Sequence, residues 1–234
     1  MSGPDAAISR PSPNFGDRRD GLRPELVVLH YTAMPDAEAA LDRLCAPEHE
    51  VSAHYLIARD GRLFRLVDED KRAWHAGAGD WRGRGDVNSR SIGIELDNCG
   101  NSPFSEPQMA RLELMLCDIL ARWGIAPEGV IAHSDFAPRR KGDPGPRFDW
   151  RRLALQGLAV WPVPASPGRR PDESAFLAAA RAFGYPVGEG FVPVLAAFRA
   201  RFRPWARGPL EAADMAAIEN LARRFAVDPA APGA

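Results

Sequence analysis

Three residues of the chain are of the types that bind a metal ion. His30 lies at the end of the apolar run 25–32, His133 lies in a second apolar run at 129–135, and Asp143 follows ten residues later. Two imidazoles and one carboxylate leave a bound metal with an open position for water. This set favours zinc and a hydrolytic reaction, with ferrous iron as the alternative metal.

The segments around these residues predict how they are positioned. The run 25–32 follows Pro24 and is rich in branched apolar residues, which predicts a buried strand with His30 near its C-terminal end. The run 129–135 predicts a second strand that presents its histidine at the same edge. The prolines and glycines of 137–146 rule out a helix and predict a fixed, turn-rich loop. Such a loop can hold Asp143 at the metal with Lys141 close by.

Each residue also has an ordinary structural explanation. A lone histidine on an apolar strand is more often a satisfied core residue, and Asp before Pro is a common turn former. Glu95 alternates with apolar residues in 91–98, which predicts a strand with Glu95 on its polar face. Glu95 is either a solvated acid or a general base that orients or deprotonates the nucleophilic water. Lys141 would then neutralise the charge of the tetrahedral intermediate or help the amine to leave.

Five segments of the first two-thirds of the chain resemble a known family in its own motif order. The chain is similar there to the zinc N-acetylmuramoyl-L-alanine amidases of the peptidoglycan amidase and peptidoglycan-recognition-protein superfamily. The segments are LHYTA (29–33), VSAHYLIARDG (51–61), KRAWHAG (71–77), NSRSIGIELDN (88–98) and AHSDFAPRRKGDPGPRFDW (132–150).

The resemblance implies a role for each of these five residues. His30, His133 and Asp143 correspond to the ligands of one zinc ion per chain, and Glu95 and Lys141 correspond to the catalytic pair. The implied reaction is hydrolysis of the amide between N-acetylmuramic acid, expected in its 1,6-anhydro form, and L-alanine of the peptide stem, in peptidoglycan recycling. The alternatives are an envelope amidase acting on intact peptidoglycan, a non-catalytic recognition module, which typically lacks the complete ligand set, and a zinc peptidase.

Four further residues are candidate substrate contacts. Trp74 and His75 lie in a glycine-rich loop that the family places beside the substrate cleft, although packing of His75 against tryptophan is nearly as good an explanation. Asn88 and Arg90 are either turn residues or anchors for the carboxylates of the peptide stem. His54 is expected to be a buried hydrogen-bonding residue rather than a ligand.

Alternating helix and strand patterns predict a mixed α/β fold, with a central mixed sheet flanked by helices. Residues 1–161 are expected to form the catalytic domain, and 162–171 a proline-rich linker. Helical spacing of apolar residues in 172–234 predicts a three-helix domain. That domain resembles a small peptidoglycan-binding domain, and packing against the catalytic domain is the competing role.

Composition limits the classes of partner. The net charge of −1 over 234 residues gives no electrostatic reason to expect a nucleic-acid or membrane partner. Cys45, Cys99 and Cys117 form no metal or disulfide pattern. Neither a secretory signal nor a membrane span is recognisable, which predicts a cytoplasmic enzyme that meets muropeptides, with the periplasm as the alternative if a leader was removed. The sequence does not indicate an oligomeric state.

Overall fold

The computed structural model describes residues 7–163 and 170–226, so most of the expected linker and the residues after 226 lie outside the description. The strands are β1 (Ile8–Ser9), β2 (Phe15–Asp17), β3 (Leu26–Tyr31), β4 (Tyr55–Ile57), β5 (Leu63–Arg65), β6 (Lys71–Ala73), β7 (Ser91–Leu96) and β8 (Val130–Ala132). The helices are α1 (Ala37–Cys45), α2 (Val87–Arg90), α3 (Glu106–Trp123), α4 (His133–Phe136), α5 (Trp150–Leu155), α6 (Glu173–Phe183), α7 (Phe191–Phe202) and α8 (Ala212–Phe225).

Six strands form the main sheet in the order β1-β5-β4-β7-β3-β8, and β2 pairs with β6 in a separate ribbon. Only the β4–β5 pair of the main sheet is antiparallel. Strand β3 lies between β7 and β8 and runs parallel to both. The predicted mixed α/β fold is confirmed. The carboxyl ends of these three central strands therefore meet at one edge of the sheet.

The side-chain alternation of the central strands separates the two faces of the sheet. Val27 and Leu29 of β3 pack into the core under α3, whereas Val28 belongs to the core on the opposite face. His30 is two residues after Val28 on the same strand, so its side chain points to the same face as Val28, away from α3. On β7, Ile92, Ile94 and Leu96 pack under α3, which leaves Gly93 and Glu95 on the face of His30. The apolar face thus fixes where the polar residues point.

Helix α3 covers one face of the sheet with its apolar side, and its sequence carries clear start and stop signals. The Ser105 side chain accepts a hydrogen bond from the backbone of Gln108, and Gly124 ends the helix with φ of +67°. Its buried side chains include Leu112, Leu116 and Ile119. The shorter helix α1 follows its N-cap Asp36, whose side chain accepts a hydrogen bond from the backbone of Ala39.

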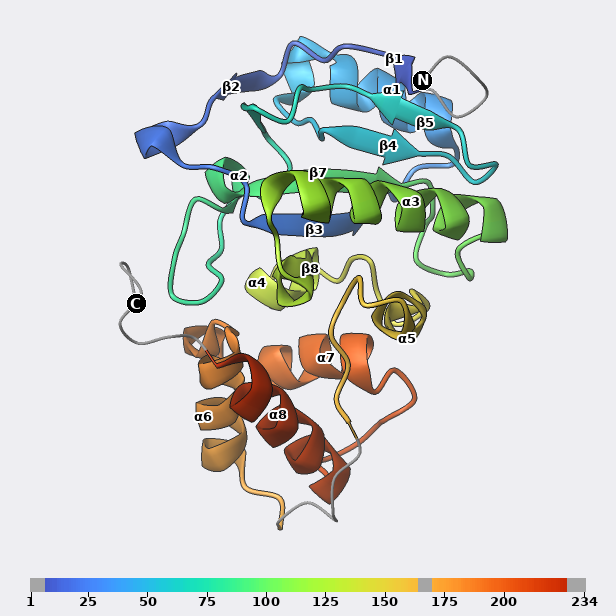
Figure 1. Ribbon diagram of the computed structural model, residues 1–234. Helices are drawn as coiled ribbons and strands as arrows, with labels where there is room; N and C mark the ends of the chain where they lie inside the picture. The colour runs from blue at the N-terminus through green and yellow to red at the C-terminus, as the bar shows by residue number, and fades with distance from the viewer. Residues whose placement is uncertain (1–6, 164–169, 227–234) are drawn as a thin grey trace.

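The three C-terminal helices lie beside the β8 end of the sheet, at the opposite end of the molecule from α1 (Figure 1). Their apolar side chains, such as Phe176 and Phe198, share one hydrophobic core with Val28 and Ile131 of the sheet. Trp81 packs edge-on against Phe183 at a ring-centroid distance of 5.7 Å. The division into domains at 161 and 172 stays a prediction, because the core runs across it.

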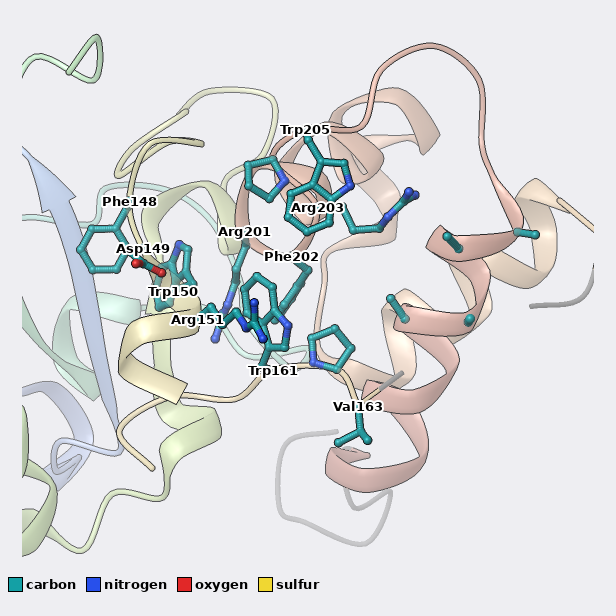
Figure 2. Close-up of a pocket in the computed structure, with 16 residues that line it drawn as sticks. Phe148, Asp149, Trp150, Arg151, Trp161, Val163, Arg201, Phe202, Arg203 and Trp205 are labelled. Carbon is teal, nitrogen blue, oxygen red and sulfur yellow. The ribbon is translucent and has the colours of Figure 1, made fainter. Parts of the chain in front are cut away.

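A buried ion pair also crosses this contact. Arg201 of α7 pairs with Asp135 of α4 and donates a second hydrogen bond to the carbonyl oxygen of Val130 at 2.8 Å. Tyr185 donates its hydroxyl proton to Asp135 at 2.8 Å. Figure 2 shows Arg201 between the α5 region and α7, where its guanidinium lies 4.3 Å from the ring centroid of Trp150. Arg201, Asp135 and Tyr185 are each at most 2% exposed, so the pair is shielded from water.

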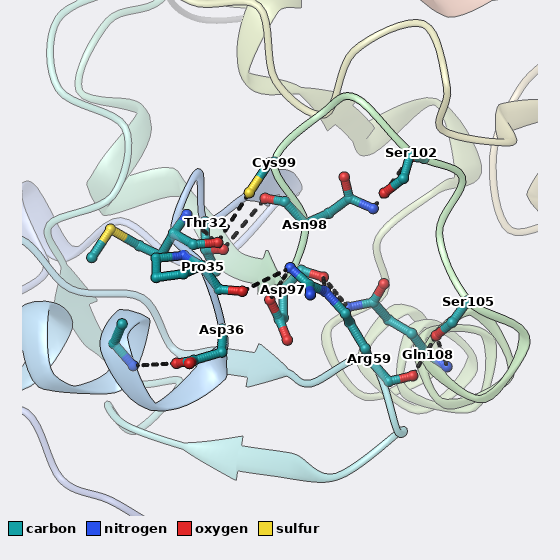
Figure 3. A network of polar contacts seen from close by, with 12 residues as sticks. Thr32, Pro35, Asp36, Arg59, Asp97, Asn98, Cys99, Ser102, Ser105 and Gln108 are labelled. Atoms are coloured by element: carbon teal, nitrogen blue, oxygen red, sulfur yellow. Dashed lines mark hydrogen bonds and ion pairs between the residues drawn. The ribbon is translucent and has the colours of Figure 1, made fainter.

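A polar network fixes the ends of the strands that lead to the predicted site (Figure 3). Arg59 donates to the carbonyl oxygen of Pro35 and forms an ion pair of 3.2 Å with Asp97. The Gln108 amide donates to the carbonyl oxygens of Ile57 and Asp97. Hence the residues just after β3, β4 and β7 are tied to the start of α3.

Other features agree with the sequence except at one element. The strand β8 ends at Ala132, so His133 begins the single helical turn α4 instead of ending a strand. The three cysteines are free thiols. Among residues 7–163 and 170–226, no helix is both long enough and apolar enough to cross a membrane.

Candidate active site

His30, His133 and Asp143 converge at the carboxyl edge of the sheet. Nδ1 of His30 lies 2.9 Å from Oδ2 of Asp143, and Nδ1 of His133 lies 3.1 Å from the same oxygen. The three ligand atoms lie within 4.8 Å of one another, and all three residues are buried. The predicted ligand set is therefore brought together by β3, α4 and the turn-rich loop.

The backbone around His133 fixes this geometry. Ring atom Nε2 of His133 lies 2.9 Å from the carbonyl oxygen of Ala76, which can only accept a hydrogen bond, so Nε2 carries the proton. The backbone N–H of Ser134 donates to the carbonyl oxygen of Asp143 at 3.1 Å, which joins the loop to α4. Nδ1 of His133 is thus left as a lone pair directed at Asp143.

The donor set suits a cation. Burial, together with the neighbouring His30, lowers the pKa of His133 to about 4, so the ring is neutral at pH 7. A lone pair and a carboxylate oxygen 3.1 Å apart repel each other unless a cation lies between them. Ligand atoms around a tetrahedral zinc are about 3.3 Å apart, from bond lengths of roughly 2.0–2.1 Å. The arrangement therefore fits zinc.

Glu95 is the acid closest to this cluster along the sheet. It is paired in register with His30 on the neighbouring strand β7. Its Oε2 is buried without a hydrogen-bond partner among the described residues. Burial raises the pKa of Glu95 to about 7, while His30 and Lys141 oppose the rise and Asp143 adds to it. A carboxyl with a pKa near 7 can both accept and return a proton at neutral pH.

A pocket of about 390 Å³ opens over the cluster. It is lined by the three ligand candidates, by Glu95 and Lys141, and by Trp74 and His75. Lys141 is exposed, whereas Trp74 is partly buried. The pocket therefore joins the predicted ligands, the predicted catalytic pair and two of the predicted substrate contacts.

A larger, mostly apolar cavity of about 740 Å³ lies elsewhere, between α5, residues 161–163 and the helices α7 and α8 (Figure 2). None of the described residues that line it belongs to the predicted site. Size alone therefore does not mark the site of the chemistry in this fold.

Three of the four predicted substrate contacts, all except Trp74, are engaged in polar contacts within the protein. Both ring nitrogens of His75 have partners, Nδ1 with His30 at 3.0 Å and Nε2 with Ser91 at 3.1 Å. The Asn88 side chain accepts from the backbone N–H groups of His75 and Ala76. Arg90 is 3% exposed and pairs with Glu25. Asn88 and Arg90 do not line the pocket, so their placement favours structural roles, and contact with substrate stays a prediction.

Sequence reasoning missed Arg140 as a pocket residue. Its guanidinium donates to the carbonyl oxygens of Ala76 and Ala78 and lies 3.4 Å from Nε2 of His133. The only signal was its position beside Lys141 in the turn-rich loop. That signal is weak, because adjacent residues of a loop point in different directions.

His54 occupies the position expected of a buried structural histidine. It is 0% exposed, its Nδ1 accepts from the backbone N–H of Gly93 at 2.9 Å, and its Nε2 donates to the carbonyl oxygen of Lys71 at 3.1 Å. Burial lowers the pKa of His54 to about 4. The neutral ring satisfies both bonds, whereas a second ring proton on Nδ1 would face the N–H of Gly93.

Known proteins resemble the chain over nearly its full length. The sequence profile of the family described as N-acetylmuramoyl-L-alanine amidase matches residues 20–146. The N-acetylmuramoyl-L-alanine amidase AmiD of Escherichia coli (strain K12) is 37% identical over 237 residues, covering 88% of this chain and 85% of AmiD.

Solved structures agree with the sequence comparisons. The complex of E. coli AmiD with the substrate anhydro-N-acetylmuramic acid-L-Ala-D-gamma-Glu-L-Lys has a TM-score of 0.80 at 34% identity and covers 92% of this chain and 99% of that chain. AmpDH3 from Pseudomonas aeruginosa, in complex with anhydromuramic pentapeptide, has a TM-score of 0.79 at 31% identity and covers 97% and 100%. These similarities extend from the sheet into the C-terminal helices.

Proposed function

Because the chain belongs to the N-acetylmuramoyl-L-alanine amidase family, we propose that it hydrolyses the amide joining the lactyl group of N-acetylmuramic acid to L-alanine of a peptide stem. The observation that carries this proposal is the meeting, in one pocket, of three candidate ligands and the Glu95 carboxyl, whose Oε2 is buried without a partner among the described residues. Non-catalytic recognition is the weaker candidate, since a binding module needs neither the complete ligand set nor a carboxyl with a pKa near 7.

In this proposal His30, His133 and Asp143 hold one zinc ion. When bound there, zinc supplies a Lewis acid that polarises the scissile carbonyl and lowers the pKa of water. Glu95 accepts a proton from the attacking water and returns it to the leaving amine of L-alanine. Its pKa of about 7 supports both steps at neutral pH. The Lys141 ammonium stabilises the negative charge that develops on the carbonyl oxygen.

The proposed substrate is a soluble 1,6-anhydro-muropeptide. The two complexes reported above, of AmiD and of AmpDH3, were solved with anhydromuramyl peptides. The partly buried Trp74 offers a ring face at the pocket against which a sugar can pack. Cleavage of intact peptidoglycan is the alternative, and the sugar form distinguishes the two substrates.

The test compares two muropeptides that differ only in the sugar, 1,6-anhydro or reducing. Mass spectrometry should detect a free peptide that begins with L-alanine, released faster from the anhydro form. Glu95→Gln should release none above background, and Glu173→Gln, an exposed acid on α6, should match the native enzyme. Cleavage between two amino acids would indicate a peptidase, and binding without cleavage would indicate a recognition module.

The compartment and the role of the C-terminal helices follow from separate experiments. We propose that the helices brace the catalytic part, because they share a core and a buried ion pair with it. Removal of residues 172–234 should then impair activity on soluble fragments. A truncated enzyme that loses only its binding to sacculi would favour a wall-binding role. Recovery of the native protein from a periplasmic fraction would contradict the cytoplasmic expectation.

A further inference from the structure

A chain of hydrogen bonds leads away from the ligand His30 and has a definite direction. The Ser91 Oγ lies 2.5 Å from the carbonyl oxygen of Val87, which has no proton, so the single hydroxyl proton of Ser91 points there. Ser91 can therefore only accept from Nε2 of His75, 3.1 Å away. This leaves Nδ1 of His75 as an acceptor, and it faces Nε2 of His30 at 3.0 Å.

The direction of the chain determines the tautomer of His30. Its Nε2 carries the proton that is donated to His75, so its Nδ1 keeps the lone pair that faces Asp143. We propose that His75 is a positioning residue that fixes the ring orientation and tautomer of His30, with Ser91 as its anchor. Hydrogen-bonded partners of metal-binding histidines act in this way in general. The inference depends on the proposed function only in that His30 binds a metal.

The same segment orients the second histidine. The carbonyl oxygen of Ala76, the residue after His75, accepts from Nε2 of His133 at 2.9 Å. Asn88 holds this segment in place by accepting from the backbone N–H groups of both His75 and Ala76, at 3.0 and 2.8 Å. The two adjacent residues His75 and Ala76, held in place by Asn88, thus determine which ring nitrogen of His30 and of His133 keeps its lone pair.

Packing reserves the space for the His75 ring. A Cβ atom added to Gly93 would lie 2.4 Å from Cγ of His75, so only glycine at 93 leaves room for it. Ser91 is 0% exposed and His75 is 9% exposed. Because both ring nitrogens of His75 already have partners, the ring has no free polar atom for a substrate. The metal site itself therefore accounts for five residues of the two motifs, which are His75, Ala76, Asn88, Ser91 and Gly93.

The test measures zinc affinity by competition with a chromophoric chelator, in the absence of substrate. His75→Leu removes the acceptor at similar size, and Ser91→Ala removes only the anchor. Each should weaken zinc binding by roughly 10- to 100-fold, the range for loss of such a partner. His75→Asn, whose Oδ1 can replace Nδ1 as acceptor, should restore most of the affinity. Thermal unfolding of the metal-free forms shows that each variant is folded.

A substrate contact would behave differently. With zinc at saturation, His75→Asn should change KM for the muropeptide less than twofold, whereas Trp74→Ala should raise KM and leave zinc affinity unchanged. Unchanged zinc affinity in both His75→Leu and Ser91→Ala would overturn the inference. If the variants lose zinc as expected but the native protein cleaves no muropeptide, the proposed function fails and the positioning role of His75 stands.

Discussion

Replacing Arg201 by Met should destabilise the whole protein, because it leaves the buried Asp135 carboxylate without its charged partner. Arg201 is 1% exposed and Asp135 is 0% exposed. Removal of one partner from a buried ion pair costs about 3–5 kcal/mol. For a chain of this size about 1 kcal/mol shifts the melting temperature by roughly 2–4 °C, so the expected decrease is about 6–20 °C. Methionine keeps most of the side-chain volume, so lost packing contributes little.

Two further variants separate the cost of the unpaired buried charge from the cost of the other interactions that are lost. Tyr185→Phe removes only one hydrogen bond to the same carboxylate and should cost about 1.5–3 kcal/mol. The double variant Asp135→Asn/Arg201→Met should cost less than the sum of its single changes, because the orphaned charge is absent. Arg223→Met, an exposed arginine of α8, serves as the control and should stay within about 0.5 kcal/mol of the native protein.

The assay is thermal and urea unfolding of the metal-free protein, followed by circular dichroism and tryptophan fluorescence. We expect one cooperative transition for every variant, since the sheet and the C-terminal helices share a core. Two separate transitions in the native protein would refute the bracing role. An Arg201→Met variant that melts with the control would refute the energetic argument for the ion pair.

Three further outcomes are expected. The purified protein should contain about one zinc per chain by metal analysis, and His30→Ala or Asp143→Ala should lose both zinc and turnover; an active variant free of zinc would contradict the ligand assignment. Glu95→Gln and Lys141→Ala should keep zinc but lose roughly two or more orders of magnitude in kcat, and near-normal turnover in either would exclude its role. His54 has a folded pKa of about 4 and an ordinary value of 6.5, so the unfolded chain binds the proton first and stability is lost as pH falls through this range. The native protein should therefore lose about 2 kcal/mol more than His54→Asn between pH 7.5 and 5 in urea unfolding, and equal losses would refute this source of acid sensitivity.

The sequence alone determined the elements that carry the site and the residues that meet there. Strand β3 could be predicted because a run of branched apolar residues has few alternatives to a buried strand, and α3 because Ser105 and Gly124 mark its ends. His30 and His133 could be predicted because they stand at the ends of such runs, and Asp143 because prolines and glycines fix the loop that carries it. Sequence patterns are sufficient where interactions between residues close in the chain, such as helix capping and apolar alternation, determine the conformation.

Only the tertiary structure decided what the polar residues between these elements do. The sequence leaves Asn88, Arg90 and His75 between substrate contacts and structural residues, whereas their hydrogen-bond and ion-pair partners on other elements favour structural roles. The C-terminal helices read as a separate module, yet Arg201 finds its partner on α4, 66 residues away in the chain. A hydrogen bond between distant segments leaves no periodicity in either one, so these roles appear only when the sheet brings both segments together.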